Sequence, residues 1–144
     1  VVAHLAHAGA MTSPHTTPTA LGWTVLYVRD VSASVALYER AFGLDVAFAH
    51  PSGDYTEFAT GTTALALCSL SLATETTKTA VADGSTPSSN ITLVVDDVEA
   101  AFRHALETGC VGRVEPTMKP WGQVSSYVTD MDDHLIELAT TVPR

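Results

Sequence analysis

The feature that most constrains this chain is an internal repeat. The segment from Trp23 to Val31 (WTVLYVRDV) reappears from Asn90 to Val98 (NITLVVDDV), with apolar and acidic residues in matching positions. Each copy is an apolar run rich in β-branched residues, followed by an acidic residue and Val and then by an amphipathic pattern. This order is typical of a strand that leads into a helix. The repeat therefore predicts a fold of two similar modules.

Turn residues divide both copies into the same order of elements. In each copy the helical spacing ends at a glycine, Gly43 in the first and Gly109 in the second, as expected for a helix C-terminus. The expected strands of the first copy cover residues 21–28, 44–49, 55–60 and 63–68. Those of the second copy cover residues 90–95, 111–118, 122–129 and 134–140. The predicted fold class is α+β, with tandem β-α-β-β-β modules.

The chain of 144 residues is long enough for one structural domain with a shared core. We expect residues 1–20 to be an N-terminal extension outside the fold, and residues 21–72 and 90–144 to be the two modules. Residues 73–89, rich in Thr and Ser, are interpreted as the linker. Asp97 is expected to cap the second helix, and the acidic turn of residues 130–133 is expected to be a solvated hairpin rather than a calcium loop.

The composition of the chain narrows the classes of molecule that it is expected to bind. A formal net charge of -9 with only seven Lys and Arg disfavours nucleic acids and anionic membranes and favours a cationic or neutral small molecule. No apolar run approaches the roughly 18 residues of a membrane span. Two cysteines, Cys68 and Cys110, are too few for a disulfide framework, so we expect free thiols and a cytoplasmic location.

The sequence resembles the vicinal oxygen chelate superfamily, which includes glyoxalase I, extradiol dioxygenases and bleomycin resistance proteins. The resemblance covers residues 21–141 and is carried by VLYVRDVSASVALYERAFGL, ITLVVDDVEAAF and PWGQVSSYVTDMDDHLIEL. It implies that each module forms half of a curved mixed sheet, that paired modules enclose a cleft, and that the protein is a homodimer. It also implies four metal ligands in that cleft for the members that use a metal.

The four ligand positions of the family fall here on Trp23, Ala66, Asn90 and Glu137. Indole and methyl groups cannot ligate a metal, and an amide oxygen is a weak ligand, so Glu137 is the one strong donor. Zinc, nickel and iron sites need three or four donors of the His, Cys or carboxylate type. We therefore expect no metal and no other cofactor.

Strand alternation places the side chains at these positions on one face of the sheets. Trp23 is a candidate platform for a planar guest, and Glu137, as a lone carboxylate in an apolar cleft, is expected to have a raised pKa. A second reading, that the indole itself fills the cleft, remains open. The expected ligand-binding residues are Trp23, Tyr27, Ala66, Asn90, Thr92, Trp121, Gln123 and Glu137.

Three functions fit this pattern. The first, which we favour, is a metal-free protein similar to bleomycin resistance proteins that sequesters a cationic or aromatic antibiotic or natural product, with no catalytic residue. The second is a glyoxalase-like lyase or isomerase, or a dioxygenase, with a degenerate metal site and Glu137 as its base. The third is a structural subunit that binds nothing. The fold alone does not decide among them.

Overall fold

The computed structural model describes residues 20–81, 87 and 89–143. It contains two four-stranded mixed sheets, one from each copy of the repeat. The N-terminal extension predicted for residues 1–20 lies outside the described residues except for Ala20, as do residues 82–86 and 88 of the predicted linker. The elements of the first module are β1 (Trp23–Val28), α1 (Val31–Phe42), β2 (Val46–Ala49), β3 (Tyr55–Phe58), β4 (Ala64–Ser69) and α2 (Leu70–Thr77). Those of the second module are β5 (Asn90–Val94), α3 (Val98–Thr108), β6 (Val111–Met118), β7 (Val124–Thr129) and β8 (Leu135–Ala139).

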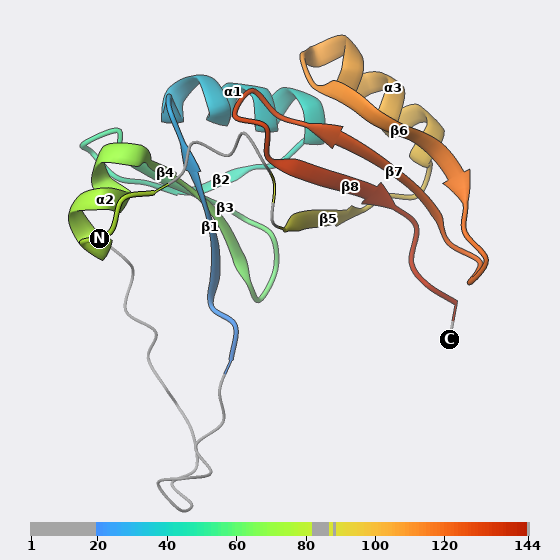
Figure 1. Cartoon of the computed structure of the whole chain (residues 1–144), viewed down its shortest axis with the longest axis horizontal. Helices are drawn as coiled ribbons and strands as arrows, with labels where there is room; N and C mark the ends of the chain where they lie inside the picture. The colour runs from blue at the N-terminus through green and yellow to red at the C-terminus, as the bar shows by residue number, and fades with distance from the viewer. Residues whose placement is uncertain (1–19, 82–86, 88, 144) are drawn as a thin grey trace, which may run out of the picture.

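The two sheets have the same topology. In the first sheet the strand order is β1-β4-β3-β2, and in the second it is β5-β8-β7-β6. The first and last strands of each module pair in parallel, and the other neighbours are antiparallel. The sheets lie next to each other, with α1 and α3 together on the same side of both (Figure 1). The predicted α+β fold of tandem β-α-β-β-β modules is confirmed.

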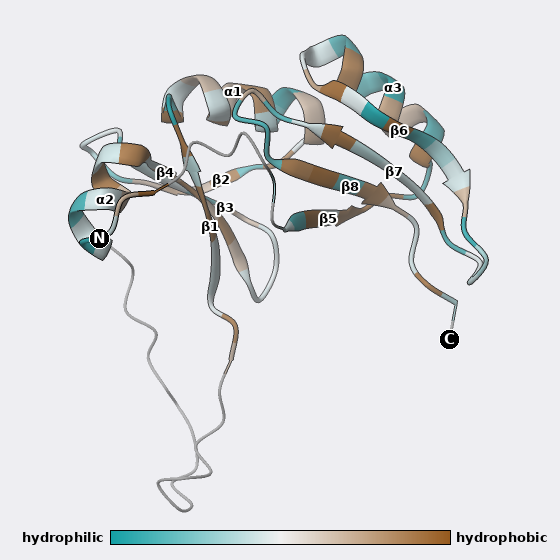
Figure 2. Ribbon diagram, viewed as in Figure 1, coloured by the Kyte–Doolittle hydropathy of each residue, from teal (hydrophilic) through white to brown (hydrophobic). Residues whose placement is uncertain are grey.

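The helices begin and end for local reasons that the repeat duplicates. The carboxylates of Asp30 and Asp97 accept hydrogen bonds from the main-chain N–H groups of Ala33 and Ala100, both at 3.0 Å, which caps α1 and α3. Gly43 ends α1 in the left-handed conformation with φ of 66°. Apolar and polar segments alternate along both helices, as expected when one helix face is buried (Figure 2). None of the described helices is long and apolar enough to cross a membrane.

One hydrophobic cluster spans both modules. It joins the faces of the two sheets that lie against the helices, with Leu37 and Tyr38 of α1, Phe102 and Ala105 of α3, and Ile136 of β8 among its buried members. Residues at odd positions of β1, and their equivalents in β5, point away from this cluster. The face of each sheet turned away from α1 and α3 is called the far face.

The helix α2 was not expected from the sequence. It lies across the predicted boundary between the first module and the linker, and its Thr and Ser content explains why the segment resembles a linker. The Ser69 hydroxyl accepts a hydrogen bond from the main-chain N–H of Leu72 and begins the helix. Ala73 is 1% exposed and packs with Tyr55, Ala66 and Cys68 in a second cluster on the far face of the first sheet. That face is therefore partly covered, whereas the side chains of Asn90, Thr92 and Val94 on the far face of the second sheet are exposed.

The acidic turn between β7 and β8 joins the two modules. The expected solvated hairpin is wrong, because Asp130 is 3% and Asp132 is 2% exposed. Asp130 accepts a hydrogen bond of 2.7 Å from the hydroxyl of Tyr38 on α1. Asp132 accepts hydrogen bonds from the main-chain N–H and the guanidinium of Arg29, at 3.1 and 2.9 Å. Buried carboxylates need such partners, and the first module supplies them. We call residues 130–133 with these contacts the clasp.

Candidate functional site

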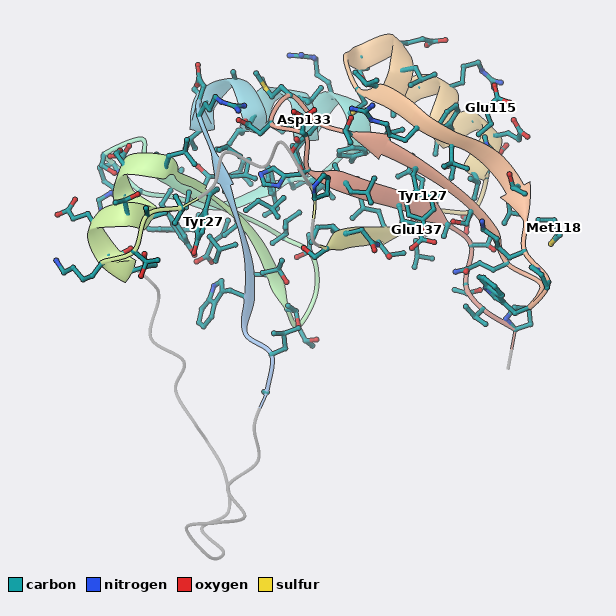
Figure 3. All side chains as sticks on the ribbon, in the orientation of Figure 1. Tyr27, Glu115, Met118, Tyr127, Asp133 and Glu137 are labelled. Atoms are coloured by element: carbon teal, nitrogen blue, oxygen red, sulfur yellow. The ribbon has the colours of Figure 1, made fainter. Side chains whose placement is uncertain are left out.

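Side-chain alternation distributes the predicted ligand-binding residues over two separate far faces. Trp23, Tyr27 and Ala66 lie on the first sheet. Asn90, Thr92 and Glu137 lie on the second sheet. In Figure 3, Tyr27 is well separated from Tyr127 and Glu137, which lie side by side on the second sheet. Within one chain, these six of the eight predicted residues therefore form two groups.

The group on the second sheet is built around a carboxylate on an inner strand. Glu137 on β8 has Thr92 as its partner on β5 and Tyr127 as its partner on β7. The hydroxyl of Thr92 donates to Oε2 of Glu137 at 2.7 Å, and the hydroxyl of Ser125 donates to Oε1 at 2.6 Å. The amide of Asn90 lies 3.1 Å from the hydroxyl oxygen of Thr92 and 3.5 Å from Oε2 of Glu137. These five residues form the Glu137 cluster, in which both carboxylate oxygens accept hydrogen bonds.

The environment of Glu137 corrects the expected pKa shift. Burial raises the pKa of this carboxyl, but hydrogen bonds from Ser125, Thr92 and Tyr127 and the charge of Lys119 outweigh burial and lower the pKa overall. The expectation of a raised pKa is wrong because the cleft position is surrounded by hydroxyl groups. A carboxylate whose pKa is lowered and whose two oxygens already accept hydrogen bonds is a weaker general base than one with a raised pKa.

The group on the first sheet contains a carboxylate that the sequence reasoning missed. Glu57 on β3 lies opposite Ala66 on β4, and Ala66 in turn lies opposite Val25 on β1. The indole Nε1–H of Trp23 donates to Oε2 of Glu57 at 3.0 Å. The hydroxyl of Tyr55 donates to the same oxygen at 2.7 Å. Trp23, Tyr55 and Glu57 form the Glu57 cluster.

Small residues on the inner strand make this cluster possible. Strands two apart in a sheet are about 10 Å from each other, so Trp23 and Glu57 meet only because Ala64 and Ala66 leave the space above β4 free. Burial first, and then the hydrogen bond to Glu57 and its charge, raise the pKa of Tyr55, which keeps the phenol protonated as a donor. The alternation Tyr55, Thr56, Glu57 on a predicted strand was the signal that places both side chains on the same face.

The position of Trp23 bears on whether its indole fills a cleft. Trp23 is partly exposed and belongs to neither of the two buried hydrophobic clusters. Its one hydrogen bond in the described part of the chain fixes the edge of the ring at Glu57. The faces of the ring are not packed into either core. This arrangement favours an indole that is available for stacking.

Trp121 and Gln123 form a local pair in the turn between β6 and β7. The indole N–H of Trp121 donates to Oε1 of Gln123 at 2.9 Å, and Nε2 of Gln123 donates to the carbonyl of Thr140 at 2.9 Å. Trp121 is 57% exposed. Within the described residues, neither side chain makes a hydrogen bond to Trp23 or to Glu137. The pair anchors the turn and leaves an exposed indole at its tip.

A groove lies between the modules and shares Thr92 with the Glu137 cluster. Its volume is about 860 Å³, and it is bordered by the C-terminal end of α1, the turn between β3 and β4, the strand β5 and the helix α3. Most of its lining is apolar, with Arg40 and His104 among the polar residues. Thr92 is the one predicted ligand-binding residue that lines it. The groove has the size of a small-molecule site, and it borders the far face of the second sheet at Thr92 and Val94.

The residues at the family's ligand positions do not fit a metal ion. Trp23 and Ala66 offer no donor, and Asn90 is turned toward Thr92. Both oxygens of Glu137 already accept hydrogen bonds from hydroxyl groups. Across residues 20–81, 87 and 89–143, no group of three or more His, Cys, Asp or Glu is placed to hold a metal ion.

Comparisons with known proteins agree on the fold. The family model for the Glyoxalase/Bleomycin resistance protein/Dioxygenase superfamily matches residues 20–138. A glyoxalase-related enzyme from Fulvimarina pelagi is similar in structure, with a TM-score of 0.77, 22% identity, and coverage of 86% of this chain and 89% of that chain. A glyoxalase/bleomycin resistance protein/dioxygenase family enzyme from Burkholderia phytofirmans PsJN has a TM-score of 0.71 and 17% identity, and the match covers 86% of this chain and 100% of that one. No curated protein matches the chain in sequence.

Proposed function

Because the chain belongs to the Glyoxalase/Bleomycin resistance protein/Dioxygenase superfamily, we propose that it binds a small organic molecule at its far faces and releases it unchanged. The observation that carries this proposal is the occupied carboxylate of Glu137. Ser125 and Thr92 donate to its two oxygens, and its pKa is lowered. Such a group suits recognition of a ligand by polar contacts better than proton abstraction. The ligand class we propose is a cationic or aromatic antibiotic or natural product, sequestered without a metal.

The exposed faces support a homodimer as the binding form. The strands β1 and β5 each have one neighbour in their sheet, so each presents an unpaired edge. Large apolar side chains are exposed on β5, β6 and β2, including Val94 at 62%, Met118 at 65% and Phe48 at 46%. We propose that a second copy covers part of this apolar surface. A second copy that covers these strands would also enclose the far faces, and light scattering on the purified protein measures the number of copies directly.

A catalytic alternative draws on the two similar structures described above, both of which are called enzymes. In that alternative a lyase, isomerase or dioxygenase uses Glu137 as its base. The hydrogen bonds to Glu137 weigh against this role, and at such low identity the similar structures bear on the fold alone. Product formation from a bound ligand is the result that would favour the enzyme.

The test is a binding screen with aromatic and cationic natural products, followed by recovery of the ligand. We expect saturable binding and an unchanged ligand. We expect Trp23→Ala and Glu137→Ala each to weaken binding about tenfold or more, which corresponds to about 1.4 kcal/mol, with an unchanged circular dichroism spectrum.

A matched control separates the far faces from the groove. Ala100 lines the groove and neither cluster, so Ala100→Leu narrows the groove alone. We expect this variant to bind as tightly as the original protein. Loss of affinity in Ala100→Leu, with full affinity in Trp23→Ala and Glu137→Ala, would move the site to the groove and contradict the proposal.

A further inference from the structure

The carboxylate of Glu57 has one oxygen in use and one available. Trp23 and Tyr55 both donate to Oε2, at 3.0 and 2.7 Å. In the part of the chain that the structure describes, Oε1 accepts no hydrogen bond. Glu57 as a whole residue is partly buried. Glu57 therefore offers a free acceptor at a fixed position.

Glu57 also has no positively charged partner among the described residues. The ion pairs that this part of the chain forms are Arg29 with Asp132 and Arg113 with Asp133. A partly buried carboxylate without a cation is stabilised when a ligand supplies one. The overall charge of -9 adds long-range attraction for the same class of ligand.

Aromatic residues lie on the same far face as Glu57, among them Trp23, Tyr27 and Tyr55. The hydrogen bond from the indole N–H holds the pyrrole edge of Trp23 at the carboxylate and leaves the faces of the ring outside the two buried clusters. Tyr27 lies on the same strand and the same face as Trp23, and Tyr55, whose hydroxyl donates to the carboxylate, is 3% exposed. An organic cation close to a carboxylate and over an indole gains from both the charge and the ring quadrupole.

We propose that Glu57 and Trp23 form the part of the binding site that selects an organic cation, with the positive group of the ligand at Oε1 of Glu57 and its apolar or aromatic body against Trp23. This inference rests on the proposed binding function and names its ligand class. The positive group is an ammonium or a guanidinium, because both donate hydrogen bonds to a free carboxylate oxygen. Glu137, whose two oxygens are occupied, then contributes polar contacts to the rest of the ligand.

The test compares phenethylammonium with phenethyl alcohol, which has a similar shape and no charge. Binding is followed by the fluorescence of Trp23 in a Trp121→Phe background, at neutral pH and high salt so that long-range attraction is screened. We expect the ammonium to bind roughly tenfold more tightly than the alcohol. In Glu57→Gln, whose side-chain oxygen still accepts from Trp23 and Tyr55, we expect this preference to disappear while the affinity for the alcohol stays within about twofold.

Glu107→Gln is the matched control, because Glu107 is an exposed residue of α3 and its loss changes the net charge by the same amount. We expect it to keep the tenfold preference. If the Trp121→Phe protein binds both compounds equally, the cation inference fails and the binding function stands. If it binds neither compound, both fail. A preference that survives Glu57→Gln in a folded protein overturns the role of Glu57, and the comparison of the two compounds on the Trp121→Phe protein needs no further variant to fold.

Discussion

The two modules share a backbone plan but place their far-face carboxylates on different strands. In the first module the inner strand β4 carries Ala66, and the carboxylate is Glu57 on the next strand, β3. In the second module the inner strand β8 carries the carboxylate, Glu137, and its neighbour on β7 is Tyr127. In the first module the long side chains of Trp23 and Glu57 meet above the alanines of β4. In the second module the hydroxyl groups of Thr92 and Ser125 donate to the carboxylate of Glu137 on the inner strand. The far face of the first module therefore carries a carboxylate with one free oxygen, and the far face of the second module carries one whose two oxygens both accept hydrogen bonds.

The two modules also differ in the turn that precedes the last strand of each sheet. The turn of residues 130–133 in the second module carries buried carboxylates that hold α1 and the end of β1. The equivalent turn in the first module, residues 59–62, carries Ala59 and exposed small residues instead. Ala59 and Thr60 line the groove, together with residues of α3 and β5. The turn of the second module therefore joins the two modules, whereas the equivalent turn of the first module borders the groove.

The largest expected effect comes from removing charge from the clasp. Asp132 is buried and accepts hydrogen bonds from Arg29, so Asp132→Asn leaves these donors with a weaker partner. We expect the free energy of unfolding to fall by about 2 to 3 kcal/mol, measured by urea denaturation.

Asp133→Asn is the control for the clasp. Asp133 pairs with Arg113 at 3.6 Å, and the two side chains are 46% and 49% exposed. Asn tolerates the positive φ of 63° at this position. We expect a loss below about 0.5 kcal/mol. Equal losses in the two variants would show that the clasp does not hold the modules together.

A smaller effect is expected at α2, which covers one far face and has no counterpart on the other. Ala73→Asp places a charge against Tyr55, Ala66 and Cys68, so α2 should detach from the sheet at a cost of about 1 to 2 kcal/mol. Burial raises the pKa of Cys68 in the native protein, and its exposure should speed alkylation by iodoacetamide about tenfold.

Two residues serve as controls for this experiment. Cys110 is buried in the main cluster, and burial together with the charge of Asp130 raises its pKa to about 11, so its slow reaction should not change. Thr74 is exposed on the same helix, and Thr74→Asp should leave both thiols protected. Faster reaction of both cysteines in Ala73→Asp would indicate global unfolding rather than the release of α2.

The smallest effect concerns the pH dependence of stability at Glu137. Its pKa is lower in the folded protein than its ordinary value, so its stabilising contribution is fully present above the unfolded pKa, about 4.3. That contribution is lost as the pH falls through the folded pKa. We expect Glu137→Gln to flatten the loss of stability on acidification below about pH 5, as measured by thermal unfolding across this range.

Glu107→Gln serves again as the control and should leave the slope unchanged, because Glu107 is exposed. A steeper slope in Glu137→Gln would mean that the hydrogen bonds from Ser125 and Thr92 do not favour the charged form.

Much of the fold was predictable because it depends on local patterns. The helix over residues 31–42 ends at Gly43 as expected, the strand over residues 111–118 has the predicted bounds, and Asp97 is the predicted cap. The assignment of Trp23 and Glu137 to far faces followed from alternation alone. The helix α2 was missed because its interior carries Thr and Ser, and contact with the sheet through Ala73 compensates for their low helix propensity.

The sequence by itself determined the repeat, the order of elements and the residue types at the four ligand positions, because backbone propensity and side-chain period act over a few residues. Only the tertiary structure decided which side chains donate hydrogen bonds to each far-face carboxylate. Whether the pKa of Glu137 rises or falls depends on the hydroxyl groups of Thr92 and Ser125, which lie on two other strands. Whether Glu57 meets Trp23 depends on the alanines of a strand between them. These contacts join residues far apart in the chain, and register and packing fix them.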